Sequence, residues 1–95
     1  MFVPFVETPE KLTISKHAKE RMVQRNIQIS EDRWAHIEEK IREAGKMGVN
    51  DSLVLLQDAA LIVSAKNNTV ITAMGREEAS THIFTNINGT ILLEN

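Results

Sequence analysis

The chain has 95 residues, of which 42% are hydrophobic and 25% are charged, and it contains no cysteine. This length suits a single domain with a modest core, and the composition is typical of a globular protein. Without cysteine, disulfides and thiolate metal sites are excluded. No apolar run approaches the roughly 18–20 residues that span a bilayer, and the N-terminus lacks the features of a signal peptide, so we expect a cytoplasmic protein that does not insert into membranes.

Basic residues are concentrated in one segment. The formal net charge is −2, but residues 11–25 hold five lysine or arginine residues and one carboxylate. The rest of the chain is therefore acidic, and a globally acidic protein is repelled by nucleic acid at long range. We expect nucleic-acid binding to be disfavoured, although the basic segment can still attract an acidic protein partner or a short stretch of RNA.

Residues 1–12 predict an extended N-terminal segment, because they include Pro4 and Pro9 and show no helical pattern. The segment is a candidate docking element through its apolar side chains, which are Phe2, Val3, Phe5 and Val6. Two interpretations remain open. The segment can lie over the core as a tail or edge strand, or it can bind a partner or a second copy of the chain.

Residues 13–48 predict two helices. Ser15 and Ser30 are good N-caps, because a serine hydroxyl can accept a hydrogen bond from a free amide in the first turn. Asn26 is a good stop for the first helix, and Gly45 and Gly48 should end the second near residue 44. Apolar residues recur at helical spacing on one face of each helix: Ala18, Met22 and Val23, and then Trp34, Ile37, Ile41 and Ala44.

Residues 52–93 predict an antiparallel sheet. Apolar or alternating runs mark strands near residues 53–56, 60–65, 70–74, 82–87 and 90–93. Asparagines in the turn at 66–69 and the pair Asn88-Gly89 are hairpin signals. We predict an α+β fold, with two N-terminal helices packed on an antiparallel β-meander of four to five strands and residues 1–95 forming a single domain. The sheet face away from the helices should carry polar side chains, namely Ser64, Thr72 and Thr85.

The sequence shows no pattern typical of a catalytic or metal site. None of the histidines has a second histidine at helical spacing, and no glycine-rich loop or nucleophile elbow is present. Glu77 and Glu78 are adjacent, but adjacent acidic residues in loops are usually solvated. We therefore predict a protein that is not an enzyme and that has neither a cofactor nor a metal.

The strongest local feature is a basic stripe on the first helix. His17, Arg21 and Arg25 are four residues apart, and on a helix they lie within a sector of about 80°. Lys16 and Lys19 flank them, and guanidinium groups bind carboxylates and phosphates in bidentate fashion. The stripe is a candidate partner-binding site. The alternatives are a solvated helix face, or arginines that bind the protein's own carbonyl and carboxylate groups.

Three segments, ISKHAKERMVQRNIQIS (14–30), DSLVLLQDAALIVSAKNNTVITAM (51–74) and IFTNING (83–89), resemble the flagellar operon proteins of bacteria. The resemblance implies a bacterial protein associated with flagellar assembly or its regulation, with a hook, rod or export component as its partner. It implies no catalytic residue, and export together with flagellar cargo stays open.

A weaker likeness is to small RelE-like toxin folds, which resemble this chain in an HAxxRxxxR helix followed by a second helix and an antiparallel sheet. Those proteins bind or cleave RNA with basic and aromatic side chains, whereas this chain has no tyrosine and is acidic. Three functions therefore remain. The first is a non-enzymatic accessory protein of the flagellum, the second is an RNA-binding or RelE-like ribonuclease-type protein, and the third is a structural protein that forms a homodimer through a sheet edge or the N-terminal segment.

Overall fold

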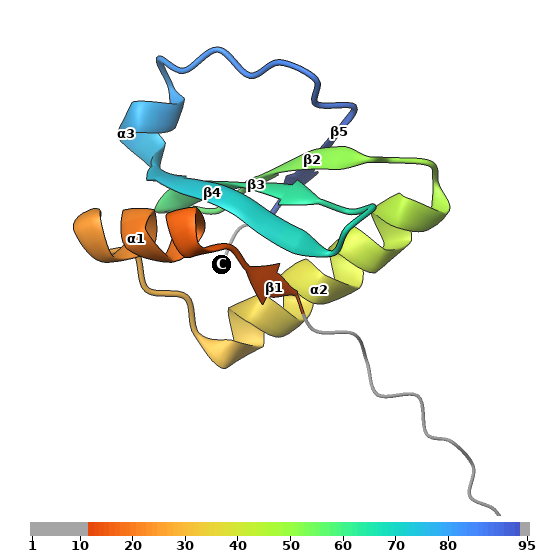
Figure 1. The fold of residues 1–95 in the computed structure, drawn as a ribbon, viewed down its shortest axis with the longest axis horizontal. Coiled ribbons are helices and arrows are strands. Elements are labelled where there is room, and N and C mark those ends of the chain that lie inside the picture. Colours follow the sequence, from red (N-terminus) through yellow and green to blue (C-terminus); the bar gives the residue numbers. More distant parts are fainter. Residues whose placement is uncertain (1–11, 94–95) are drawn as a thin grey trace, which may run out of the picture.

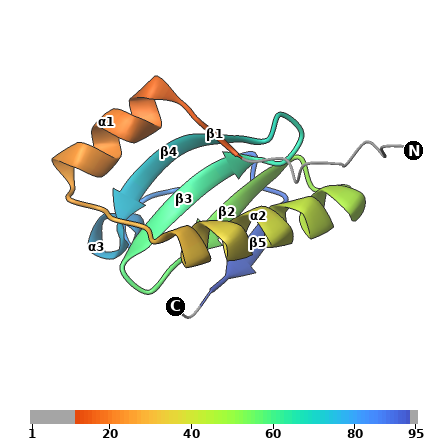
Figure 2. The same ribbon diagram turned by 90° about the horizontal axis from the view of Figure 1, so that it is seen from below.

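The computed structural model describes residues 12–93, which form one five-stranded sheet with two helices against one face (Figure 1). Figure 2 shows the longer of these helices in front of the strands and the other helix beside one edge of the sheet. The helices are α1 (Lys16–Gln24), α2 (Glu31–Lys46) and the short α3 (Arg76–Ala79). The strands are β1 (Thr13–Ile14), β2 (Asp51–Leu55), β3 (Ala59–Ser64), β4 (Thr69–Gly75) and β5 (Gly89–Leu92). The predicted α+β class is confirmed.

The sheet is mixed, with the strand order β1-β4-β3-β2-β5. Its centre is the predicted antiparallel meander, because β3 pairs antiparallel with both β2 and β4. Both edges are parallel, however: β1 pairs with β4, and β5 pairs with β2. The prediction of a wholly antiparallel meander is therefore wrong at both edges of the sheet.

Local capping fixes the helices where the sequence predicts them. The hydroxyl of Ser15 accepts a hydrogen bond from the Ala18 amide at 3.0 Å, and that of Ser30 accepts one from the Arg33 amide at 3.2 Å. Asn26 ends α1 in the left-handed region, with φ of 55°. Gly48 does the same after α2, with φ of 92°, whereas Gly45 lies inside the helix instead of ending it.

The main core lies between the sheet and the two helices. Fully buried side chains from α2 meet fully buried side chains from the three central strands, and these include Ile37, Ile41, Val54, Leu61, Val63 and Val70. Ala18 is the buried contact of α1. The sequence assigns Val23 to the same buried stripe, and this assignment is wrong because Val23 is 81% exposed. The α1 helix therefore packs on the core through Ala18 and the half-buried Met22.

The opposite sheet face is also apolar, which contradicts the prediction of a polar face. A second cluster there is built around Ala60, Met74 and Ala79, with half-buried Leu53, Leu55, Ile62 and Phe84 packed against it. Of the side chains predicted for a polar face, Thr72 does lie on β4. Ser64 is buried, and its hydroxyl accepts a hydrogen bond from the Asn67 amide. The chain that follows α3 passes over this face (Figure 1).

Residues 82–87 do not form the predicted strand, and Asn88-Gly89 is not a hairpin turn. The β5 strand is at the end of the sheet and pairs with β2, so residues 82–87 do not pair with β5 as a hairpin would require. The side-chain Oδ1 of Asn88 instead accepts from the amides of Asn50 and Asp51, at 2.9 and 3.2 Å. These bonds secure the start of β5 beside the start of β2.

Candidate functional site

The basic stripe lies on α1, which is attached to β4 at its N-terminus. The Ser15 hydroxyl donates to the Ile71 carbonyl at 3.0 Å, and the Ser15 amide donates to the Val70 carbonyl at 3.1 Å. Near this end, His17 of the stripe and the flanking residues Lys16 and Lys19 are exposed. No ion pair joins Lys16 or Lys19 to another residue within 12–93.

Arg21 and Arg25, at the other end of the stripe, both bind Glu78 of α3. Arg25 does so in bidentate fashion, with Nε 2.9 Å from Oε1 and Nη2 3.0 Å from Oε2. Arg21 Nη2 donates to the same Oε2 at 3.0 Å. The three charges sum to one positive charge, so part of the stripe has the internal pairing that the sequence left as an alternative. We define the α1–α3 surface as this cluster together with the exposed residues Lys16, His17 and Lys19.

The two arginines lower the pKa of Glu78. The hydrogen bond from Arg25 is the largest cause. Burial of the carboxyl opposes it, the charges of Arg25 and Arg21 reinforce it, and the pKa falls from 4.5 to about 2. The same contact raises the pKa of Arg25. The Glu78 side chain is 34% exposed, so solvent screens the pairs. The contribution to stability is modest, but its pH range is well defined.

Replacing Glu78 by glutamine is expected to remove a pH-dependent part of the stability. Because the pKa is depressed in the folded state, the ion pairs stabilise the fold above about pH 4.5 and are lost as the pH falls towards 2. The free energy of unfolding is measured with urea at a series of pH values. Above about pH 4.5 it should be larger for wild type than for Glu78→Gln, and this difference should vanish near pH 2. Glu77→Gln, which changes an exposed neighbour, should give curves parallel to wild type. A difference between Glu78→Gln and wild type that is constant with pH would contradict this assignment.

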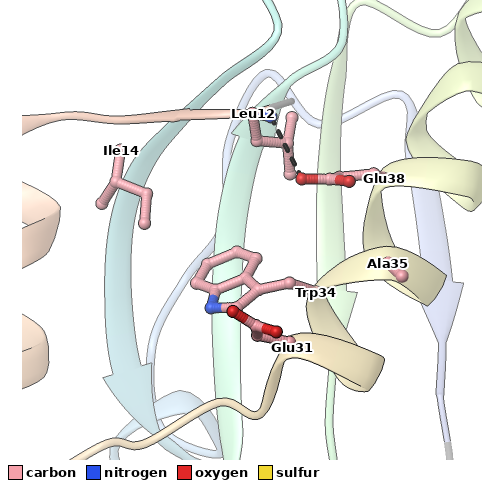
Figure 3. Close-up of a pocket in the computed structure, with 6 residues that line it drawn as sticks. All are labelled: Leu12, Ile14, Glu31, Trp34, Ala35 and Glu38. Carbon is pink, nitrogen blue, oxygen red and sulfur yellow. Dashed lines mark hydrogen bonds between the residues drawn. The ribbon is translucent and has the colours of Figure 1, made fainter. Parts of the chain in front are cut away.

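A groove opens between β1 and α2 (Figure 3). It has a volume of about 420 Å³ and is lined by Leu12, Ile14, Glu31, Trp34, Ala35 and Glu38. A second hollow of about 540 Å³ lies on the other side of Ile14, against α1, with apolar walls that include Met22, Val23 and Ile27. The sequence identified Trp34 as a core residue only, because the apolar periodicity of a helix does not reveal a side chain that also borders an opening.

The sequence-predicted docking residues Phe2, Val3, Phe5 and Val6 lie outside the described residues. Glu78 is the site residue that the sequence analysis missed, since it was expected to be solvated. Its partners Arg21 and Arg25 are more than fifty residues away along the chain, so no local pattern could have revealed the contact.

Within 12–93, no three histidine, aspartate or glutamate side chains converge as a metal site would require. No helix in this part of the chain is long and apolar enough to cross a membrane.

A family model described as "Putative flagellar" matches residues 69–92. The match supports a relationship to a flagellar-associated family. It extends over β4, α3 and β5, about a quarter of the chain, and it includes Glu78. No curated protein matches the chain, and no solved structure does. The predicted likeness to RelE-like toxin folds therefore gains no support from a comparison of structures.

Proposed function

We propose that this chain is a non-enzymatic accessory protein of the bacterial flagellum, which acts by binding an acidic surface of a hook, rod or export component. The observation that carries the proposal is that the matched segment and the basic stripe form one surface. Residues 69–92 supply Glu78, and Glu78 is the carboxylate to which Arg21 and Arg25 bind. The segment related to flagellar proteins thereby helps to orient the stripe.

The charge of the α1–α3 surface favours an acidic partner. Lys16 and Lys19 add two exposed charges to the positive cluster of Arg21, Arg25 and Glu78, whereas the whole chain carries −2. Opposite charges on two surfaces accelerate their encounter and disfavour partners of the wrong sign. Exposed Val23 lies beside Lys19 and adds an apolar contact at the same place, and the exposed Glu20 borders the same hollow. An acidic protein surface with an apolar patch fits this arrangement.

Charge reversal at Lys16 and Lys19 tests the proposal better than reversal of the arginines. Arg21→Glu or Arg25→Glu would place a new carboxylate against Glu78 and disturb the fold. Lys16→Glu with Lys19→Glu leaves the cluster intact, and both positions are exposed. Lys46→Glu with Lys66→Glu is the matched control, because it makes the same charge change at exposed positions outside the α1–α3 surface.

Affinity purification from a flagellated bacterium, with mild crosslinking, is the measurement. We expect hook, rod or export proteins to be enriched with wild type and with the control variant. Enrichment should fall at least about tenfold with Lys16→Glu and Lys19→Glu, which corresponds to about 1.4 kcal/mol of binding. Unchanged enrichment would place the contact elsewhere on the molecule. Enrichment of RNA or ribosomal proteins in place of flagellar ones would overturn the flagellar assignment.

A further inference from the structure

We infer that the groove between β1 and α2 is the docking site for residues 1–6, the apolar first half of the chain's own N-terminal segment. The groove is open and largely apolar where it borders the main core: Leu12, Ile14 and Trp34 are half-buried there and pack against that core. Figure 3 shows the indole of Trp34 lying between the side chains of Ile14 and Glu31. This inference does not depend on the proposed flagellar function.

Leu12, the first described residue, lies in the wall of this groove. The Leu12 amide donates to Glu38 Oε2 at 3.4 Å, so the first described residue is tied to α2 (Figure 3). Trp34 lies four residues before Glu38 on the same helix, a separation of about 6 Å along the axis. The six peptide units from Val6 to Leu12 can span up to about 20 Å, so the segment can reach the indole with chain to spare.

The composition of the segment matches that of the groove. Five of its first six residues are apolar, and Phe2 and Phe5 are the largest. A phenylalanine side chain can bury about 150–250 Å² of surface, and a groove of about 420 Å³ has room for one or two such rings. Exposed phenylalanine is unfavourable in water, so a neighbouring apolar groove is a favourable place for these side chains.

Tethering favours the chain's own segment over one from a second copy or from a partner. Two groups joined by a short stretch of chain meet at an effective concentration in the millimolar range, far above the micromolar concentrations at which separate molecules usually meet. The connection here is the short stretch between Val6 and Leu12. The docked segment would cover Trp34 in the isolated protein.

Trp34 provides a direct test, because it is the single tryptophan of the chain. In the variant Phe2→Ser with Phe5→Ser, the emission of Trp34 should move to longer wavelength and acrylamide should quench it more strongly than in wild type. Glu7→Gln with Glu10→Gln changes the same segment without removing apolar surface, and should leave both quantities unchanged. Far-UV circular dichroism should show that all variants remain folded.

The test also distinguishes the possible occupants. If the emission difference between wild type and the phenylalanine variant persists on dilution, the segment docks within its own chain. If the difference disappears on dilution together with a dimer mass, the groove binds the segment of a second copy, and the inference is overturned. If the two proteins have the same emission at every concentration, the segment does not occupy the groove, which also overturns it.

A variant of the groove wall gives a second readout that does not rely on fluorescence. Ala35 is exposed and lines the groove, so Ala35→Arg should obstruct docking without disturbing the core. Chymotrypsin should then cleave after Phe2 and Phe5 faster than in wild type. His36→Arg, at an exposed neighbouring position outside the groove lining, should leave the cleavage rate unchanged. Equal cleavage rates in Ala35→Arg and wild type would contradict docking at this site.

Discussion

Replacing Ile37 by alanine is expected to lower the free energy of unfolding by about 2–5 kcal/mol, the usual range for a buried isoleucine truncated to alanine. Ile37 has no exposed surface and lies where α2 packs on the sheet. The substitution removes buried methyl and methylene groups. It leaves a cavity, because the strands beneath cannot move to fill the space. For a domain of this size the melting temperature should fall by roughly 10–30 °C.

Urea unfolding followed by circular dichroism measures this loss. Ile37→Val removes one methylene and should cost only about 0.5–1.5 kcal/mol, so the two variants form a graded series. Glu39→Ala is the control on the same helix, because its side chain is exposed and alanine is a good helix former. A loss below about 1 kcal/mol in Ile37→Ala would show that α2 is not packed on the sheet in this way.

The second large effect is expected at Gly89, the first residue of β5. A Cβ atom at this position would lie 2.8 Å from both Cγ atoms of Val49. Val49 cannot easily yield, because it is β-branched and its amide is bonded to the Ala44 carbonyl at 3.0 Å. Gly89→Ala should therefore destabilise the protein by about 1–3 kcal/mol, the usual cost of overpacking.

A double-mutant cycle separates this clash from other effects of the substitution. Val49→Ala removes the two methyl groups that a Cβ at Gly89 would meet, so Gly89→Ala should cost less in the Val49→Ala background by about 0.5–3 kcal/mol. Gly45→Ala is the control, because nothing lies near its Cβ and the residue is inside α2. That substitution should stabilise the protein by about 0.5–1 kcal/mol. If the destabilisation of the double variant equalled the sum of those of Gly89→Ala and Val49→Ala, the proposed clash would be refuted.

Elements with local signals were predictable from the sequence. The serine caps, the asparagine that accepts positive φ after α1 and the apolar periodicity of α2 all act within a few residues, and they place both helices correctly. The three central strands are joined by short turns, so their antiparallel pairing follows from the same local pattern. In the 66–69 turn, Asn68 has φ of 55°, as that pattern predicts.

The candidate site was predictable only in part. The spacing of Arg21 and Arg25 correctly places them on one helical face, but it carries no information on the carboxylate that they meet. Glu78 is held by α3 at the end of β4, more than fifty residues further along the chain. The groove at Trp34 is likewise formed by β1 and α2, which are separated by the whole of α1.

The sequence by itself determined the two long helices, the central meander and the basic face of α1, because short-range sterics, capping and periodicity act before the chain is compact. Only the tertiary structure decided the two parallel edges. The β1 strand has two residues and no pattern of its own, and it exists because β4 offers an edge. The pair Asn88-Gly89 is a strong local hairpin signal. In the structure, however, the side-chain oxygen of Asn88 accepts hydrogen bonds at the start of β2, and Gly89 packs against Val49. Contacts between segments some forty residues apart, which exist only once the sheet has formed, here outweigh a turn preference.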